Sequence, residues 1–554
     1  MPKMKDRNAQ LRGALGAIAP KERIVEANSI PKEDTVNRQG KAAYSYSDKL
    51  RLVMMLNTLK VQPQFYRSEN DQLRELRDLI EKIAITDPYF VAQAIVWSRC
   101  LGEGMRTINH LAAALLSPFA SGLPWAKRFY NLFDKNKKQG GCIFRVDDMT
   151  EIKDAYVALT GKPLSNAMRK GFADAIEHLD TFLLARYKSS VIDIANLSHP
   201  KSKLSSAVIT VDGTEMKTLD ALMRGISVSA DTWEVAQSEA GQEVAKAVKE
   251  GKLTKQEAEK VLAEAKADNW ESLLKDGKLG IMAALRNIRN ILKNPREDTV
   301  NEWCDLINDP DRIRKALILP IYFDLAYDVV DKEFGHDKYA DKVRQTLQDA
   351  YTKSLPNLKT AMPGKTLVVI DCSGSMGGYP VSDGKTPVSY SWYSRDRGGT
   401  RNASYKAGLI AATFASALDA DVIQFGGSAK WAQYNKRANV FTMASELGGD
   451  WYGSTNPAAA FRLIRDERKI YDRIIFISDN EVNGKLTSAA YKEYIHDVCS
   501  PYIYGIDLCA YGTAALAGDK VSYYFGYGPA MYEAIASHEF NPDSVMKEIE
   551  SIVI

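Results

Sequence analysis

The stretch TLVVIDCSGSMG, residues 366–377, decides the fold of the C-terminal third of this 554-residue chain. Its first five residues are apolar or β-branched without interruption, which is typical of a parallel strand covered on both faces. Asp371 follows directly, and two serines and two glycines come next. Such a polar loop at the carboxyl end of a first parallel strand lies where open α/β sheets bind ligands.

Strand and helix patterns alternate from this strand onward. Apolar β-rich runs at 421–426, 473–478 and 502–509 are separated by helical patterns at 404–418, near 456–464 and at 488–499. Alternating β and α elements favour a doubly wound open sheet. We therefore predict an α/β domain over residues 361–554.

The preceding residues carry a different pattern. In YSDKLRLVMMLNTL, residues 46–59, apolar side chains recur at i, i+3, i+4 and i+7, as on one face of a helix. Similar amphipathic segments follow one another to about residue 360 with almost no strand signal between them. Each helical pair must bury its face on the next, so the pattern predicts an irregular α-solenoid over 38–360. Residues 1–37 are polar and form a predicted N-terminal arm.

Composition limits the class of protein. With 45% apolar and 26% charged residues, the chain is typical of soluble globular proteins. The net charge is +3, and the excess of Lys and Arg lies in residues 1–210, which suits either a polyanionic partner or a solvated basic surface. Six scattered cysteines without a CxxC pair, no secretory signal and no membrane-spanning apolar run predict a cytoplasmic protein without a membrane partner.

The polar loop after the first strand carries the chemistry that the sequence predicts. Asp371, Ser373 and Ser375 can point one carboxylate and two hydroxyls at a common centre, and oxygen ligands suit magnesium, manganese or calcium. Loops at 453–456 and 478–480 should lie at the same edge of the sheet. The arrangement is similar to the metal-ion-dependent adhesion site of von Willebrand factor A domains. That resemblance implies five metal ligands: Asp371, Ser373, Ser375, Thr455 and Asp479. The alternative is a loop that is held by hydrogen bonds and binds no metal.

A metal ion in such a site keeps an open position. Hydroxyls and water contribute no charge, so an acidic group from a partner could complete the shell. Residues 379–402 should hang over the same edge, and their interleaved aromatic and arginine residues suit either RNA stacking or a flexible surface insertion.

No catalytic constellation emerges from the sequence. Gly364-Lys365-Thr366 lacks the first glycine of a P-loop and precedes a strand, and Ser373 is not in a GxSxG elbow. The six histidines show no metal-binding spacing. A single metal site lacks the carboxylate cluster of a two-metal nuclease. We therefore expect a protein that is not an enzyme.

Several helical segments resemble one known family. Five segments together look like the TROVE module followed by a von Willebrand factor A domain, in the order found in Ro autoantigen proteins. The segments are residues 41–59, 163–187, 191–201, 279–292 and 347–376. The resemblance covers residues 38–554 and is to a bacterial or phage-like Ro protein. Residues 379–402 and the charged helical pair at 231–277 depart from the family pattern.

The resemblance implies a fold and a function. It implies a ring of HEAT-like helical pairs closed by the A domain, acting as a monomer. Small noncoding Y-like RNAs would bind the basic outer face, and single-stranded ends of misfolded RNA would enter the central hole. Bacterial relatives work with exoribonucleases in RNA processing, so an exoribonuclease is a further expected partner.

The basic residues that match the family segment are the predicted RNA contacts. Arginine and lysine neutralise phosphates, although some of these side chains could instead cap helices or pair with acidic neighbours. On the helix at 279–292, Arg286 and Arg289, with Asn290, are candidates for the hole, whereas Met282, Leu285 and Ile288 suit the core. The outer-face candidates are Arg169, Lys170, Arg186, Lys188, His199, Lys201 and Lys203.

The sequence thus favours an RNA chaperone or scaffold acting in RNA quality control, with magnesium as the expected cation. A rival of another class is a protein-interaction adaptor whose A domain grips an acidic partner. A third hypothesis is an A-domain protein of the metal-chelatase type, but such proteins lack the TROVE-like segments. The basic N-terminal third favours RNA, because a clamp for an acidic partner gives it no role.

Overall fold

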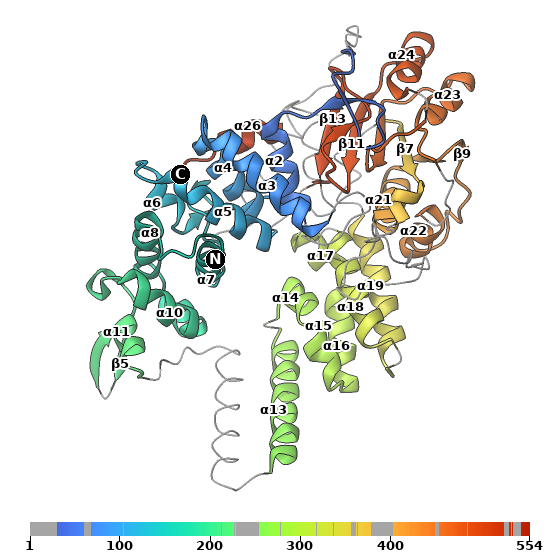
Figure 1. Ribbon diagram of the computed structural model, residues 1–554. Helices are drawn as coiled ribbons and strands as arrows, with labels where there is room; N and C mark the ends of the chain where they lie inside the picture. The colour runs from blue at the N-terminus through green and yellow to red at the C-terminus, as the bar shows by residue number, and fades with distance from the viewer. Residues whose placement is uncertain are drawn as a thin grey trace. The chain divides into compact units, whose positions relative to one another are not determined.

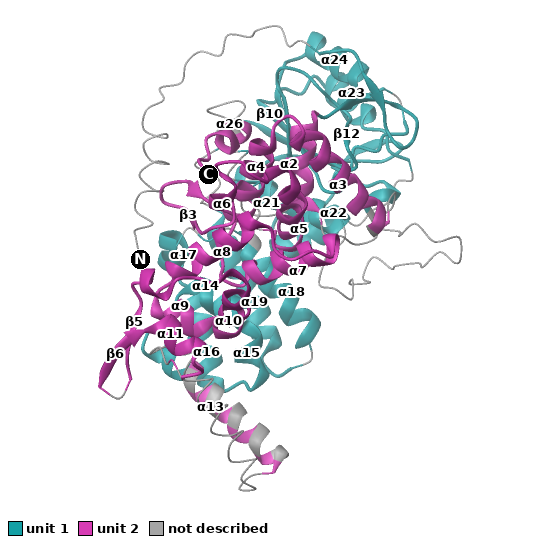
Figure 2. Ribbon diagram, turned by 60° about the vertical axis from the view of Figure 1, so that its left-hand side comes forward, with its two compact units in different colours: residues 1–46, 63–66, 271–542 teal, residues 47–62, 67–270, 543–554 magenta. Residues whose placement is uncertain are grey.

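The computed structural model divides into two compact units, which are described separately below (Figures 1 and 2). Unit 1 contains residues 1–46, 63–66 and 271–542, and unit 2 contains residues 47–62, 67–270 and 543–554. The structure describes residues 30–59, 68–102, 105–211, 213–226, 228, 254–277, 279–316, 318, 320–335, 337–355, 362, 364–377, 403–448, 454–484, 486–525, 531–532, 535 and 544–554.

Unit 1 is built on a six-stranded sheet with the order β13-β11-β10-β7-β8-β9. The first five strands in this order are parallel, and β9 joins β8 antiparallel at the edge. The central strand β7 therefore lies between β10 and β8, and its carboxyl end meets those of both neighbours. The strands are β7 (Thr366–Asp371), β8 (Asp421–Phe425), β9 (Ala429–Trp431), β10 (Arg473–Ser478), β11 (Tyr502–Asp507) and β13 (Val521–Phe525).

Helices cover the sheet because its central strands are apolar on both faces. All six residues of β7 and all six of β10 are buried. Alternate residues such as Leu367 and Val369 share one core with α23 and α24, while α21 packs against β7. The helices are α21 (Ala403–Leu418), α22 (Val440–Gly448), α23 (Ala458–Asp466) and α24 (Thr487–Asp497).

A set of helices that precedes the sheet in sequence belongs to the same unit. Tyr327 of α18 stacks on Phe441 of α22 at 4.6 Å between ring centroids, and the Tyr351 hydroxyl of α19 lies 2.5 Å from that of Thr413. The set comprises α14 (Ile281–Arg286), α15 (Ile288–Lys293), α16 (Glu297–Ile307), α17 (Pro310–Ala316), α18 (Pro320–Glu333) and α19 (Ala340–Ser354). The helices before the sheet therefore pack onto the α/β fold.

An N-terminal hairpin also joins unit 1. β1 (Thr35–Val36) pairs antiparallel with β2 (Ala42–Ser45), and β2 pairs with β12 (Thr513–Ala514), which follows β11. The sequence predicts residues 1–37 as a polar arm. Residues 1–29 lie outside the described residues, and residues 35–36 are a strand of this small sheet.

Unit 2 is a succession of packed helices around one core. Their buried faces share a single apolar cluster that includes Leu52, Phe90 and Phe172. The helices are α2 (Asp48–Thr58), α3 (Glu69–Ala84), α4 (Pro88–Cys100), α5 (Thr107–Ala120), α6 (Ala126–Phe129), α7 (Asp148–Thr160), α8 (Asn166–Glu177), α9 (Thr181–Arg186), α10 (Lys188–Ser198), η1 (Ser202–Leu204) and α11 (Thr218–Met223). Helix α13 (Lys255–Lys275) crosses the sequence boundary between the units.

Unit 2 also contains elements that the helical pattern does not predict. Two hairpins interrupt the helices: β3 (Phe133–Asp134) with β4 (Gln139–Gly140), and β5 (Val208–Val211) with β6 (Thr214–Lys217). The C-terminal helix α26 (Ser544–Glu550) packs on α4, and Ile552 lies in the helical core. The compact units divide the chain differently from the predicted domains: α14–α19 belong to unit 1, as do residues 1–46, whereas residues 543–554 belong to unit 2.

Candidate functional site

The five predicted metal ligands lie at one edge of the unit 1 sheet. Asp371 ends β7, and Asp479 follows the last residue of the neighbouring β10. Ser373 and Ser375 occupy the turn after β7, which includes η2 (Gly374–Gly377), and Thr455 precedes α23. All five side chains are buried, with exposed fractions between 0 and 7%.

Hydrogen bonds link these residues to one another. Ser373 donates its backbone N–H to Asp371 Oδ1 at 2.8 Å, and Ser478 donates its hydroxyl to Asp371 Oδ2 at 2.6 Å. The hydroxyls of Ser373 and Ser375 lie 3.2 Å apart, and Ser375 hydrogen-bonds Asp479. The pair Ser373 and Ser375 therefore links the two aspartates, because Ser373 contacts Asp371 and Ser375 contacts Asp479.

Thr455 is fixed through its backbone. Its N–H donates to Asn483 Oδ1 at 2.8 Å, and its carbonyl accepts the N–H groups of Asn483 at 3.1 Å and Gly484 at 2.9 Å. Asn483 and Gly484 belong to the loop that begins at Asp479. The loop that carries the threonine is thus tied to the loop that carries the second aspartate.

The electrostatics of this edge suit a cation. Burial raises the pKa of Asp371 to about 7, and the nearby charge of Asp479 adds to the effect. Burial also raises the pKa of Asp479, whose Oδ2 is buried without a hydrogen-bond partner. An unpartnered buried carboxylate oxygen is costly unless a positive charge compensates it. The residues therefore fit a divalent cation.

The donor set limits which cation fits. Within the described ranges, no three His, Cys, Asp or Glu side chains are grouped so that they could hold an ion by themselves. Two carboxylates and three hydroxyls are hard oxygen donors, which suit magnesium, manganese or calcium. When bound, such an ion would offer an open coordination position to an acidic or phosphate oxygen.

The seven outer-face candidates all lie on unit 2, between α8 and η1. Arg169 and Lys170 are on α8, Arg186 ends α9 and Lys188 begins α10. His199 directly follows α10 and has the left-handed conformation, with φ +55°. Lys201 directly precedes η1, and Lys203 lies within it. All seven are exposed.

The acidic residues of the same stretch are engaged elsewhere. Asp174 pairs with Lys127 at 3.0 Å, and Asp193 pairs with Lys153 at 2.7 Å. Asp180 accepts the N–H of Leu183 at the start of α9. Glu177 accepts the backbone N–H of Lys201, not its ammonium group. Within the described residues, none of these four acidic side chains forms an ion pair with Lys170, Lys188 or Lys203.

The contacts of the basic side chains agree with those of the acidic ones. In the part of the chain that the structure describes, no ion pair involves Lys170, Lys188 or Lys203. Arg169 donates to the neutral Asn166 side chain at 3.2 Å, and the Arg186 guanidinium lies 5.5 Å from the ring centroid of Tyr187. The stretch offers positive charge to solvent.

The two candidates for the central hole differ from these residues. Arg286 and Arg289 belong to unit 1, and the Arg289 guanidinium pairs with Glu333 at 2.5 Å. On the same helical segment Leu285 and Ile288 are buried in the core, as expected, and Met282 is half-buried. Arg286 is exposed and is the stronger of the two candidates.

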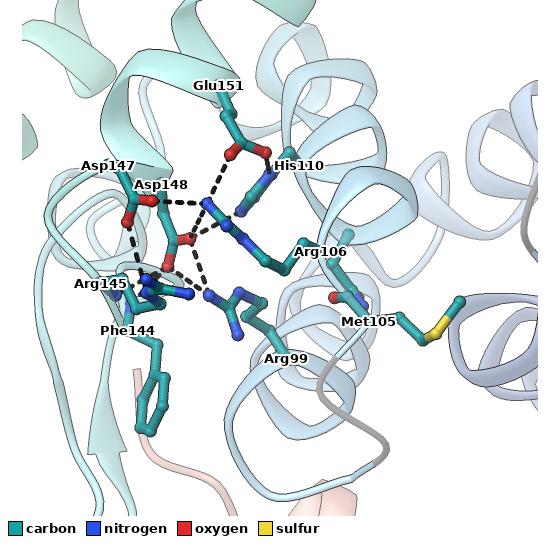
Figure 3. Close-up of polar contacts among 10 residues, drawn as sticks. Arg99, Met105, Arg106, His110, Phe144, Arg145, Asp147, Asp148 and Glu151 are labelled. Carbon is teal, nitrogen blue, oxygen red and sulfur yellow. Dashed lines mark hydrogen bonds and ion pairs between the residues drawn. The ribbon is translucent and has the colours of Figure 1, made fainter. Parts of the chain in front are cut away.

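A buried charge network in unit 2 was not foreseen from the sequence (Figure 3). Asp148 contacts Arg99 at 2.7 Å and His110 at 3.0 Å, and Arg106 joins Asp148 to Asp147. These residues lie on α4, α5 and α7 or directly before α5 and α7, and the network links the three helices. No local sequence pattern predicts this network, because its members are up to about fifty positions apart.

Residues 379–402, predicted to overhang the metal edge, lie outside the described residues.

Within the described ranges, none of the helices combines the length and the apolar character needed to cross a membrane.

The fold defines a class: a protein of packed helices together with a mostly parallel α/β sheet. Residues 232–369 match the TROVE domain family model. The crystal structure of the Deinococcus radiodurans Ro (RSR) protein matches with a TM-score of 0.56 and 16% identity, over 89% of this chain and 100% of that chain. No curated protein matches the chain.

These matches confirm the predicted resemblance and fold class. A segment of the chain is similar to the TROVE domain family, and its fold is similar to that of the Deinococcus radiodurans Ro protein. Residues 232–277, which depart from the family pattern in the sequence, lie within the matched segment.

Proposed function

We propose that the chain is a noncoding-RNA-binding protein of the Ro type. The observation that carries the proposal is the exposed basic stretch between α8 and η1. Arginine and lysine that neutralise phosphates release condensed counterions, and this term supplies most nonspecific affinity for nucleic acid. Loops and helix ends can present such side chains to an irregular RNA surface. The TROVE match and the Ro fold support the same function.

The finer assignments follow the family resemblance. A small Y-like RNA would bind the basic stretch from outside, and single-stranded ends of misfolded RNA would enter a central hole of a monomeric ring closed by the A domain. The protein would act without catalysis in cytoplasmic RNA quality control, with an exoribonuclease as a partner. Arg286 is the residue of unit 1 that we assign to the single-stranded path.

We further propose that the sheet edge of unit 1 binds a divalent cation, magnesium in the cell. Asp371, Ser373, Ser375, Thr455 and Asp479 would hold it, and the unpartnered Oδ2 of Asp479 supports this assignment. The rival function, an adaptor that grips an acidic protein, uses this same site. It leaves the basic stretch of unit 2 without a role.

Charge reversal tests RNA binding. Replacing Arg169, Lys170, Arg186 and Lys188 together by Glu should weaken binding to a structured noncoding RNA far more than to a short single-stranded oligonucleotide. Each lost phosphate contact should also reduce the slope of log K against log salt by about 0.7 to 0.9. Binding is measured by filter retention at several salt concentrations.

A second surface of the same unit provides the control. Replacing Arg74, Arg77, Lys82 and Lys137 by Glu changes the net charge equally, and these side chains are 61 to 74% exposed. Equal losses in both variants would show only a global field effect. No loss in either variant would contradict RNA binding by this stretch and favour the adaptor.

A further inference from the structure

Glu481 lies beside the metal edge of unit 1 and outside the predicted ligand set. It is two residues after Asp479, and its side chain is fully buried. Its Oε2 accepts the backbone N–H of Arg38 at 2.9 Å, whereas its Oε1 is buried without a hydrogen-bond partner. The backbone N–H of Glu481 donates to Asp479 Oδ1 at 3.0 Å, so the two residues are linked directly.

The N-terminal hairpin holds this glutamate in place. Asn37 donates its side-chain N–H to the carbonyl of Val482 at 2.7 Å and is 5% exposed. Its Oδ1 accepts the N–H groups of Gln39 and Lys41, each at 3.0 Å, which shapes the tight turn of the hairpin. The pairing of β2 with β12 anchors the hairpin to the same unit.

Burying a carboxylate with one unpartnered oxygen has no structural benefit by itself. A hydrophobic or amide side chain would fill the space without the desolvation cost of a charge. Glu481 does not join Asp371 and Asp479 in a group that could hold an ion directly, because the described residues contain no such group of three. Glu481 would therefore act on a cation from outside the ligand shell.

We propose that Glu481 is an outer carboxylate of the cation site, positioned by Asn37 and Arg38 of the N-terminal hairpin to accept a hydrogen bond from a cation-bound water. Magnesium and manganese keep several waters when protein ligands are few, and such waters need acceptors. Outer partners of metal ligands typically change affinity ten- to a hundredfold when they are replaced. The inference rests on the proposed cation site and adds the hairpin to it.

The test measures manganese binding to the full-length protein by electron paramagnetic resonance, with melting temperatures in EDTA and in excess manganese. Glu481→Gln matches the size of glutamate and removes the charge. It should weaken manganese binding on the order of tenfold or more. Its melting temperature in EDTA should equal or exceed that of the wild type, while the rise caused by manganese becomes smaller.

Three further variants complete the design. Glu481→Asp keeps the charge and should retain more affinity than Glu481→Gln. Asn37→Ala releases the hairpin from Val482 and should weaken manganese binding while Glu481 is intact. Glu33→Gln is the control, because Glu33 accepts hydrogen bonds from Ser488 and Tyr44, and neither residue belongs to the proposed cation site.

The outcomes separate the two proposals. If the wild type binds no manganese, the cation site itself is wrong. If the wild type binds and Glu481→Gln binds equally well, the role of Glu481 is wrong. If Glu481→Gln loses affinity but Asn37→Ala does not, the positioning role of the hairpin is overturned.

Discussion

Asp148→Asn should weaken unit 2 more than any neighbouring surface change, because Asp148 is the centre of a buried charge network (Figure 3). Its side chain is fully buried. Asp148 Oδ1 faces Arg99 and His110, and Oδ2 accepts the backbone N–H groups of Phe144 at 3.0 Å and Arg145 at 2.8 Å. An amide in this place has one acceptor oxygen, so at least one group of donors must lose its partner.

The expected loss of stability follows from the pKa of Asp148 and from the loss of the charged partner of Arg99. Burial opposes ionisation, but hydrogen bonds from His110 and Arg99 outweigh it and lower the pKa of Asp148 from 3.8 to about 2. A difference of this size corresponds to roughly 2 to 3 kcal/mol at neutral pH. Arg99, which is 5% exposed, also loses its charged partner. Removing one member of a buried pair typically costs about 3 to 5 kcal/mol, so we expect about 3 kcal/mol.

The same shift predicts a dependence on pH. The folded pKa of Asp148 is lower than its unfolded value, so its contribution to stability is fully present above about pH 4. It is lost as the pH falls from about 4 towards 2, where the folded carboxylate becomes protonated. The Asp148→Asn variant has no carboxylate here, so its disadvantage should shrink over this range.

Hydrogen–deuterium exchange is the suitable assay, because it reports local opening in a chain of two compact units. The opening free energy of peptides from α4 and α7 should fall by about 3 kcal/mol in Asp148→Asn. Asp147→Asn is the matched control: Asp147 precedes it, is 27% exposed and pairs with Arg106. Its loss should stay below about 1 kcal/mol. Equal protection of α4 and α7 in the two variants would refute the reasoning.

Three further predictions concern the remaining parts of the molecule. Asp371→Ala should abolish manganese binding in a calorimetric titration and leave exchange in unit 2 unchanged; unchanged affinity would contradict the cation site. Gly408→Ala should lower the melting temperature of unit 1, at a cost of about 1 to 3 kcal/mol, because the added Cβ would meet the Ala444 carbonyl where α21 and α22 pack closely. Gln93→Ala should increase exchange in α26, since the Gln93 amide donates to the carbonyls of Glu550 at 2.8 Å and Ile552 at 2.9 Å; unaltered exchange there would show that apolar packing alone holds the segment.

The central strands and the metal edge were predictable because their signals are local. The apolar run of β7 and the polar residues that follow it are adjacent in sequence, and parallel strands bring their carboxyl ends to one edge. The five candidate ligands are therefore gathered by the order of the elements alone. Whether they hold a cation stays a prediction.

The parts that sequence reasoning missed depend on distant partners. Strand β12 has two residues, and its place is set by pairing with β2 from the opposite end of the chain. The β5–β6 hairpin did carry a local signal, an Asp-Gly pair between β-rich runs, with Gly213 at φ +78°. The contact of Glu481 with the Arg38 N–H could not be predicted, because the two residues are more than four hundred positions apart.

The exchanged terminal segments have a consequence for biosynthesis. The helical core of unit 2 includes Ile549 and Ile552, which are translated only after the whole sheet of unit 1. At about 5 to 20 residues per second, the ribosome needs roughly 10 to 60 seconds to translate residues 271–542. During this interval the helices of unit 2 are outside the ribosome with part of their apolar surface uncovered. A nascent chain stalled before residue 544 should therefore be a better chaperone substrate than one released with α26 attached.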